Sequence, residues 1–314
     1  MSSSALLIVQ RKGLGALACA IFFELKAAVY RSVLGRRFMR RRVRDFEMLI
    51  DLEDAGISRT LLLFGQREEE HVVMLRYVLR PGMTVFDVGA NIGYYVLIEH
   101  GLLGSSGHIV AIEPSPQNVD LLRRNVALNG VANITIIEMG VSSRAGRQPF
   151  HLSYQSNLNT FHPIGSVVKH LDNRIIDVEI DAIPAIARRV GRKPDLIRMD
   201  VEGHEVEIIT GILPAIEAGE MAPMFLFETH LTRYTPEHDF EAPLRALFRC
   251  GYRARYVASS SEGGTVKVAK RGYTGGEPIE TDMIERVIFE DVREDDFIDL
   301  VCREGGVRCA LLSK

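Results

Sequence analysis

The sequence predicts an α/β fold with a mainly parallel sheet and helices on both faces. Along residues 83–314, short apolar runs typical of buried strands alternate with segments of helical periodicity. The run at 84–88 is followed by Gly89 and Gly93 and then by a helical segment, an arrangement that brings backbone N–H groups close to a bound ligand. The composition, 46% apolar and 25% charged residues, is that of an ordinary folded protein.

Residues 1–45 are predicted to form a basic, amphipathic helical arm, in which residues 5–34 are apolar and an arginine-rich run follows at 36–42. The uncharged stretch at 13–23 is shorter than the roughly twenty residues of a spanning helix, and no small-residue cleavage site follows it. We therefore expect a cytoplasmic protein. An apolar helix beside a basic cluster is compatible with peripheral contact at the inner face of a membrane. The alternative is an arm that packs on its own domain or on a partner subunit.

The remaining elements follow from local patterns. Residues 46–82 are expected to be a helical lead-in, with a strand at 47–53 and a helix from the acids at 68–70 to Pro81 and Gly82. In the main domain, 83–314, strands are expected at 84–89, 108–112, 134–137, 196–199, 224–227, 252–257 and 307–312. Helices are expected at 93–102, 116–129, 183–190, 204–211, 239–250 and 294–304. An exposed strand is expected at 177–181, and a mobile loop or hairpin at 259–276.

Some partners are disfavoured by the sequence. The net charge of −3 favours no partner of either sign, and no aromatic residues are interleaved with the arginines in the way that suits nucleic acid. The four cysteines form no CxxC pair and no histidine-rich cluster, so we expect no metal and a reducing compartment.

Polar side chains follow several of the predicted strands at their carboxyl ends, where open α/β sheets bind ligands. They are Asp87, Asn91, Glu113, Asp200, Glu202, Glu228 and His230. Glu113 stands twenty residues after Gly93, where a carboxylate can accept both hydroxyls of a ribose. Nicotinamide cofactors, flavins and S-adenosylmethionine all carry such a ribose.

The spacing of the glycines distinguishes the binding sites of these cofactors. A dinucleotide site has the pattern G-x-G-x-x-G, and residues 89–93 lack its middle glycine. Asp87 would repel a pyrophosphate but suits a sulfonium with an ammonium group. An NAD(P)-dependent oxidoreductase is therefore the less favoured enzyme, and a non-catalytic, membrane-associated binding protein is a further alternative.

The segments 87–93, 195–203 and 225–230 together resemble the FkbM family of S-adenosylmethionine-dependent methyltransferases, over about residues 47–256. The resemblance implies a class I methyltransferase (Rossmann-like) fold with a seven-stranded, mostly parallel sheet whose last strand is antiparallel. It implies O-methylation of a hydroxyl on a sugar, glycolipid or secondary metabolite. The family often has Lys where this chain has Arg198.

The resemblance also implies roles for individual residues. The expected cofactor-binding residues are Asp87, Gly89, Ala90, Asn91, Gly93, Glu113, Pro114, Gly140 and Asp200. The candidate catalytic residues are His230, ranked first as the base, Asp200 and Glu202, whereas His204 is expected only to begin a helix. The candidate substrate residues are Asn157, Asn159 and Glu228, with His162 in the same polar loop. The acceptor and the oligomeric state are not predicted.

Overall fold

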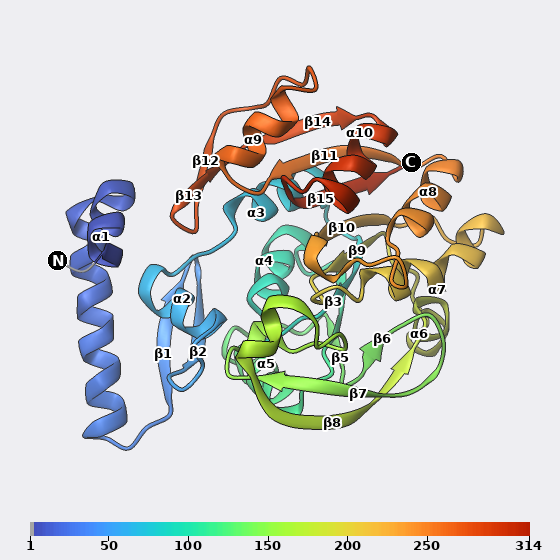
Figure 1. The fold of residues 1–314 in the computed structure, drawn as a ribbon. Helices are drawn as coiled ribbons and strands as arrows, with labels where there is room; N and C mark the ends of the chain where they lie inside the picture. Colours follow the sequence, from blue (N-terminus) through green and yellow to red (C-terminus); the bar gives the residue numbers. More distant parts are fainter. Residues whose placement is uncertain (1–2) are drawn as a thin grey trace.

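The computed structural model describes residues 3–314, and its centre is one eight-stranded sheet (Figure 1). In spatial order the strands are β14 (Ile288–Val292), β11 (Arg253–Ser259), β15 (Val307–Ser313), β10 (Met224–Glu228), β9 (Leu196–Met199), β3 (Thr84–Val88), β4 (His108–Ile112) and β5 (Ile134–Ile137). The five strands from β10 to β5 are parallel, and β15 is antiparallel to both of its neighbours.

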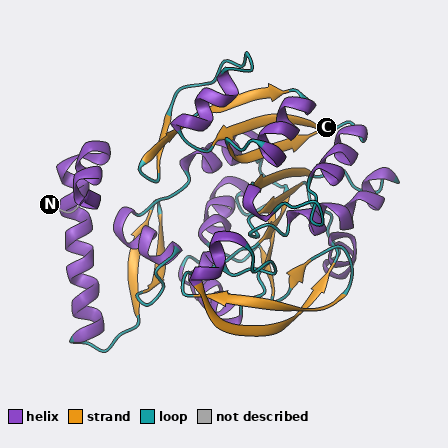
Figure 2. Cartoon of the chain, in the orientation of Figure 1, coloured by secondary structure: helices purple, strands orange, loops and turns teal. Residues whose placement is uncertain are grey.

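Helices cover both faces of this sheet (Figure 2). One buried apolar cluster contains residues of α6 (Ile183–Val190), α7 (Glu205–Glu217), α8 (Glu241–Arg249) and α10 (Glu294–Ile298). The other contains residues of α2 (Ile57–Phe64), α3 (Glu69–Val78), α4 (Tyr94–Leu103) and α5 (Pro116–Leu128). Phe86 and Val88 of β3 belong to the first cluster and Val85 to the second, because successive side chains of a strand point to opposite faces.

The predicted fold class is confirmed, including the antiparallel last strand, but the sheet has one strand more than the seven expected. The extra strand is β14, which pairs with β11 at the edge of the sheet. The prediction of a mobile loop or hairpin at 259–276 was wrong in part, because α9 (Glu262–Ala269) forms there. Its N-cap Ser261 accepts a hydrogen bond from the Gly264 N–H, so the serines and glycines of this stretch begin a helix.

A three-stranded sheet of β6 (Gly140–Val141), β8 (Leu171–Asp181) and β7 (Gly146–Ser153) is inserted between β5 and α6 (Figure 2). The exposed strand expected at 177–181 is the end of β8. Between β7 and β8 the chain forms η1 (Ser156–Leu158) and η2 (Gly165–His170). A short turn, η3 (Leu231–Arg233), follows β10, and η4 (Asp299–Arg303) continues α10; β12 (Ile279–Thr281) and β13 (Ile284–Arg286) form a hairpin.

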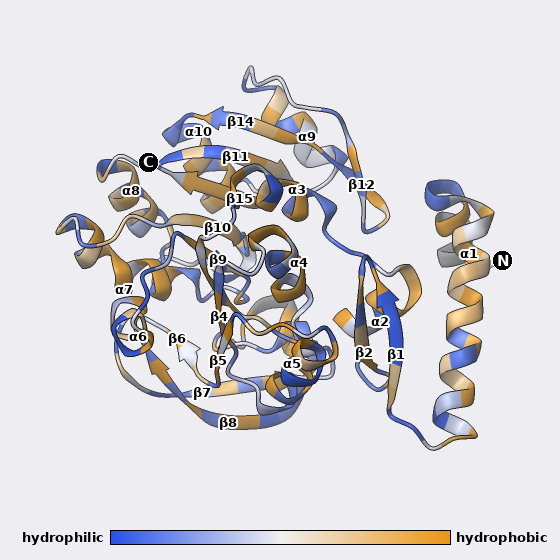
Figure 3. Cartoon of the chain, turned by 180° about the vertical axis from the view of Figure 1, so that it is seen from behind, coloured by the Kyte–Doolittle hydropathy of each residue, from blue (hydrophilic) through white to orange (hydrophobic). Residues whose placement is uncertain are grey.

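The N-terminal region differs from the expected helical arm. The helix α1 (Ser3–Ser32) is followed by a hairpin of β1 (Phe38–Val43) and β2 (Phe46–Asp51), so the arginine-rich run is a strand. The expected amphipathic pattern was also wrong, because apolar residues do not gather on one face of α1. Figure 3 shows apolar and polar residues mixed along this helix. The sequence suggested amphipathicity from composition, whereas an apolar face requires a period of 3.6 residues.

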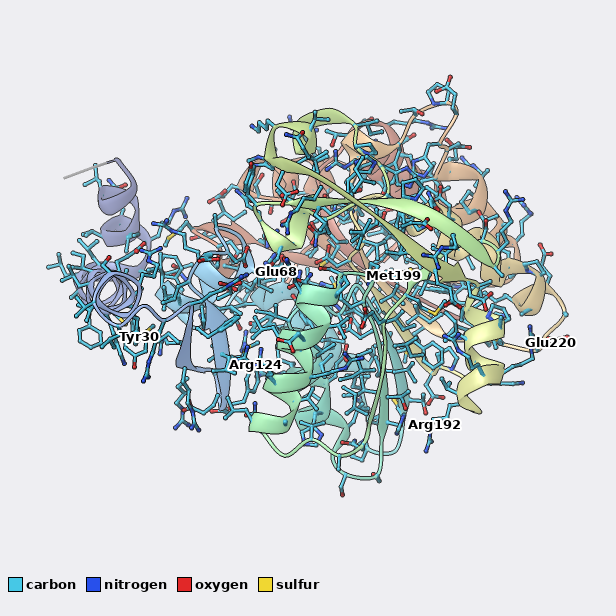
Figure 4. The ribbon with its side chains drawn as sticks, turned by 90° about the horizontal axis from the view of Figure 1, so that it is seen from below. Tyr30, Glu68, Arg124, Arg192, Met199 and Glu220 are labelled. Carbon is cyan, nitrogen blue, oxygen red and sulfur yellow. The ribbon has the colours of Figure 1, made fainter. Side chains whose placement is uncertain are left out.

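The hairpin is bound to the main domain, whereas α1 lies at the edge of the molecule, as an end-on view shows (Figure 4). The Leu49 N–H of β2 donates to the side chain of Asn125 on α5 at 2.7 Å, and Asn129 donates to the Glu47 carbonyl at 2.7 Å. By length and composition, Ile8–Ser32 meets the requirement for a membrane-spanning helix, with a mean hydropathy of 1.5, although signal sequences meet it as well. The helix α1 also contacts the rest of the chain, since Arg31 donates to the Leu52 carbonyl at 3.0 Å and Arg11 pairs with Glu262 at 2.6 Å.

Candidate functional site

A glycine-rich loop joins β3 to α4 at the carboxyl edge of the sheet. Gly89 and Gly93 have φ values of +80° and +90°, which glycine adopts readily. A Cβ at Gly89 would lie 2.3 Å from the backbone oxygen of Asp200, so no other residue fits between the ends of β3 and β9. Asn91 is also left-handed, with φ +50°, and this turns its backbone N–H toward β4.

Glu113, the first residue after β4, is held in place by three donors. Its Oε2 accepts from the Asn91 N–H at 2.9 Å, and its Oε1 accepts from the Ser115 N–H at 3.0 Å and from Asn118 Nδ2 at 3.1 Å. Burial raises the pKa of this carboxyl to about 7, although the three hydrogen bonds favour its ionised form. The carboxylate is thus fixed in position with lone pairs left for a ligand.

Two adjoining cavities lie against the loop. The Glu113 cavity, of about 470 Å³ including its open mouth, is lined by Val88, Gly89, Asn91, Ile112, Glu113, Pro114, Met139, Gly140, Val141, Phe150, Ser156, Asn157, Asn159, Phe161, Asp200, Val201 and His204. The Arg67 cavity, of about 350 Å³, is lined by Ile57, Arg67, Glu68, Gly89, Ala90, Asn91, Tyr94, Tyr95, Asn157, Arg198 and Asp200. Together they contain nine of the twelve residues predicted for cofactor or substrate binding; Asp87, Gly93 and Glu228 line neither.

Asp87 lies beneath the loop and has no exposed surface. Its Oδ1 accepts from Arg198 Nη1 at 2.9 Å, and the Arg198 guanidinium lies 3.8 Å from the centre of the Tyr95 ring. The expectation that Asp87 faces a cationic ligand therefore differs from its position in the structure. Asp87 instead orients Arg198, which reaches the Arg67 cavity.

His230, the first candidate for the base, is surrounded by carboxylates. Its Nδ1 lies 2.9 Å from Glu205 Oε1, and its Nε2 lies 3.4 Å from Glu228 Oε1 and 3.8 Å from Glu202 Oε1. Burial by itself lowers the pKa of His230, but Glu205 and Glu202 outweigh it and raise the pKa well above its usual value. A histidine that is already protonated donates hydrogen bonds and has no lone pair with which to accept a proton, so this environment disfavours its expected role.

Asp200, the second candidate, lines both cavities, and its Oδ1 lies 3.9 Å from His230 Nε2. Burial and the neighbouring Glu228 raise the pKa of Asp200 to about 6, although Arg198 opposes them. A carboxylate with a pKa near neutrality is suited to accept a proton. The geometry therefore favours Asp200 over His230 as the base.

The charged residues that complete the Arg67 cavity were not predicted from the sequence. Glu68, labelled in Figure 4, pairs with Arg67, accepts from Arg308 Nη2 at 2.8 Å, and accepts from the Tyr95 hydroxyl at 2.7 Å. Burial alone would raise the pKa of Glu68, but Arg67 and Arg308 lower it well below its usual value. The acids at 68–70 were noticed only as a helix start, and nothing local indicates that Glu68 meets a residue 240 positions away.

The polar loop at 153–160 forms part of the lining of the Glu113 cavity through Ser156, Asn157 and Asn159. Asn91 Nδ2 donates to the Ser156 carbonyl at 3.2 Å and joins this loop to the glycine loop. Asn159 supports the loop through its Oδ1, which accepts from the Ser153 N–H at 2.8 Å. The Oδ1 of Asn157 is buried without a partner in the described residues, and Asn157 lines both cavities, so of the two predicted asparagines it is the freer to bind a ligand.

The parallel sheet, the antiparallel last strand, the glycine loop and the acid after β4 together define a class I, Rossmann-like methyltransferase fold. Residues 87–254, more than half of the chain, match the Methyltransferase FkbM domain, and the chain belongs to this family. Its cofactor is S-adenosyl-L-methionine.

Three curated relatives match parts of the chain. Methyltransferase sdnD of Sordaria araneosa is 30% identical over 163 residues, 41% of this chain and 60% of that protein. Hexuronic acid methyltransferase AglP of Haloferax volcanii is 27% identical over 155 residues, 48% and 59% respectively. The 31-O-demethyl-FK506 methyltransferase FkbM of Streptomyces tacrolimicus is 30% identical over 162 residues, 43% and 61%. The chain thus spans about three fifths of the length of these relatives.

Solved structures resemble the chain more distantly. A precorrin-6y C5,15-methyltransferase from Geobacter metallireducens is 15% identical, with a TM-score of 0.39 over 78% of this chain and 89% of that one. Aeropyrum pernix fibrillarin with bound S-adenosyl-L-methionine is 11% identical, with a TM-score of 0.34 over 71% and 74%.

Proposed function

We propose that this protein transfers a methyl group from S-adenosyl-L-methionine to a hydroxyl oxygen of a sugar, glycolipid or secondary metabolite. The observation that carries the proposal is Asp200, a partly buried carboxyl with a pKa of about 6 at the junction of the two cavities. A hydroxyl must lose its proton as it is methylated, and a carboxylate there can accept it. The names of two relatives, the hexuronic acid methyltransferase AglP and the 31-O-demethyl-FK506 methyltransferase FkbM, agree with an oxygen acceptor.

The two cavities fit the two ends of the cofactor. Glu113 would accept hydrogen bonds from the ribose hydroxyls, with Pro114 and Gly140 on the walls beside it. The Arg67 cavity offers Arg67 for a carboxylate, and Glu68 and Asp200 for an ammonium group, so it suits a zwitterionic amino acid. Gly89 and Asn91 line both cavities, and Ala90 lines the Arg67 cavity, so the glycine-rich loop lies where the two cavities adjoin. When bound, S-adenosyl-L-methionine supplies an activated methyl group on a positively charged sulfur.

The acceptor would be held on the His230 side of Asp200. A protonated His230 donates hydrogen bonds, and Glu202 and Glu228 surround its Nε2 at 3.8 and 3.4 Å. The Nε2 is buried and has no hydrogen-bond partner in the described part of the chain, so an acceptor oxygen that reached it would satisfy this donor. In this proposal His230 and Glu228 position the hydroxyl, and Asp200 takes its proton.

We also propose that α1 attaches the enzyme to a membrane and that residues 83–314 form the catalytic domain. Large apolar side chains of α1 are exposed, among them Leu14, Phe22 and Leu25. The lead-in is part of the cofactor site in this proposal, because Arg67 and Glu68 belong to it. An N-terminal attachment would leave the carboxyl edge of the sheet free for the reaction.

The test is isothermal titration of the full chain with S-adenosylhomocysteine, followed by methyl transfer to a panel of hydroxyl-bearing sugars and glycolipids. We expect one cofactor site per chain and a product heavier by one methylene group. Cofactor binding without transfer to any hydroxyl, together with transfer to a nitrogen or carbon acceptor, would refute O-methylation. Cofactor binding without transfer to any acceptor class would favour the non-catalytic alternative.

A further inference from the structure

Three histidines and one glutamate meet beside the Glu113 cavity. His162 comes from the loop between η1 and η2, His204 is the N-cap of α7, Glu207 lies in the first turn of α7, and His238 precedes α8. We call these four residues the histidine cluster. Because they come from three separate segments of the chain, no spacing of the kind that marks a zinc site in a sequence is present.

Four distances between nitrogen and oxygen atoms of the histidine cluster are close to those between the ligand atoms of one metal ion. His204 Nδ1 lies 2.9 Å from His162 Nε2 and 3.4 Å from Glu207 Oε2. The Glu207 carboxylate lies 3.1 Å from His238 Nε2 and 3.6 Å from His162 Nε2. With zinc–ligand bonds of about 2.0–2.1 Å, the edges of a tetrahedron are about 3.3–3.4 Å. The four measured distances are thus within a few tenths of an ångström of a tetrahedral edge, and the ligand atoms of His162, Glu207 and His238 all lie within 4.8 Å of one another.

The outer nitrogens of two of these histidines are also held, as in metal sites. His238 Nδ1 lies 2.9 Å from the Arg233 carbonyl, and a carbonyl can only accept, so Nδ1 carries the proton and Nε2 faces inward. His204 Nε2 lies 3.1 Å from the Ser142 hydroxyl, which leaves Nδ1 facing the cluster. Metal-binding histidines are characteristically oriented by a second hydrogen bond of this kind.

We propose that the histidine cluster binds one zinc ion in a closed, four-ligand site. Three imidazoles and one carboxylate form a ligand set that suits zinc, and four protein ligands leave no open position, which is typical of structural sites. The ion ties the loop that carries His162 and the segment that carries His238 to the start of α7. Phe161 and His204 line the Glu113 cavity, so the ion stiffens one wall of the cofactor site.

A second group of possible ligands, Asp200, Glu228 and His230, is less suited to a metal. Arg198 faces Asp200 at 3.4 Å, and Arg308 pairs with Glu228, so both carboxylates already have a cationic partner. The carboxylate of Glu207, in contrast, faces only histidines among the ion pairs of the described residues.

The test uses the untagged full-length protein, freed of metal with a chelator and titrated with zinc chloride by calorimetry. We expect one zinc per chain and a raised melting temperature, and cobalt in place of zinc should give the intense visible absorption of a tetrahedral ion. His238→Ala and Glu207→Gln should lose this binding. Ser142→Ala, which removes only the outer partner of His204, should weaken it by roughly tenfold or more.

The matched control is His108→Ala, since His108 lies in β4 and bonds only to Thr135 among the described side chains. It should bind zinc as the wild type does. If His238→Ala fails to fold, as judged by circular dichroism, His162→Gln serves in its place. Folded wild-type protein that takes up no stoichiometric zinc, or equal zinc binding by the cluster variants, would overturn the proposal. Because zinc is measured without cofactor, this failure would leave the methyltransferase proposal untouched.

Discussion

Replacing Glu113 by glutamine tests the cofactor site most directly. The carboxylate has donors on both oxygens: Asn91 N–H on one, and Ser115 N–H with Asn118 Nδ2 on the other. A glutamine of the same shape must place its NH₂ group on one of these sides. It then faces a buried donor, either that of Asn91 or that of Ser115, and no rotation of the amide satisfies both.

Two effects of known size follow. An unsatisfied buried donor costs about 1–3 kcal/mol of folding free energy, so the melting temperature should fall by several degrees. Hydrogen bonds to a charged acceptor contribute about 1.5–3 kcal/mol each, and the glutamine keeps at most part of the two that the ribose would donate. A net loss of about 2 kcal/mol corresponds to roughly 30-fold weaker binding of S-adenosylhomocysteine.

The assay is calorimetric titration with S-adenosylhomocysteine at pH 8, where Glu113 is mainly ionised, combined with thermal unfolding of the free protein. The matched control is Glu138→Gln, since Glu138 follows β5, is exposed, and contacts Arg123 at 3.6 Å. The control should change affinity less than twofold. Wild-type affinity in a folded Glu113→Gln variant would refute the assignment of the ribose to Glu113.

Four further predictions follow from the same geometry. Asp200→Asn should lower kcat by about 10²–10⁴-fold and leave the protein folded, measured by methyl transfer; undiminished kcat would exclude Asp200 as the base. Gly89→Ala should abolish cofactor binding and lower the melting temperature, because the Cβ would meet the Asp200 carbonyl and φ is +80°. Since the pKa of free Glu113 is about 7, wild-type affinity for S-adenosylhomocysteine should be roughly tenfold lower at pH 6 than at pH 8, and Glu113→Gln should lack this dependence. The raised pKa of Glu113 affects folding stability in the opposite direction. Its contribution to the free energy of unfolding is complete below pH 4.5, the pKa in the unfolded chain, and is lost as the pH rises through about 7. Deletion of residues 1–34, which spares the β1–β2 hairpin, should reduce sedimentation with anionic vesicles and leave cofactor affinity unchanged; equal sedimentation of both proteins would contradict membrane attachment.

The alternation of strands and helices was predictable because it depends on local patterns. Continuous apolar runs such as 84–88 and 196–199 are buried on both sheet faces, and such runs need no knowledge of their neighbours. The glycine loop was predictable for a similar reason, since a turn with positive φ selects glycine. The edge strand β14 and the helix α9 were missed because their patterns are short and depend on pairing with β11 and on the Ser261 cap.

The charges of the site were not predictable, because each depends on which distant groups come together. Asp87 was expected to face a ligand, but its carboxylate accepts a hydrogen bond from Arg198, 111 residues away in the chain. His230 looked like a base at its ordinary pKa, and only the fold surrounds it with Glu205, Glu202 and Glu228. Glu68 and Arg308 come from the lead-in and the last strand and meet beside the cavity.

By itself, the sequence determined the fold class, the family, the cofactor and most of the residues that line its cavities. These depend on periodicity, on glycine, and on the rule that parallel strands present their carboxyl ends at one edge of the sheet. Only the tertiary structure decided that the pKa values of Asp200 and His230 are raised, and that His162, His204 and His238 meet around Glu207. Protonation and metal binding depend on distances of a few ångströms between residues far apart in the chain, and these distances exist only once the chain has folded.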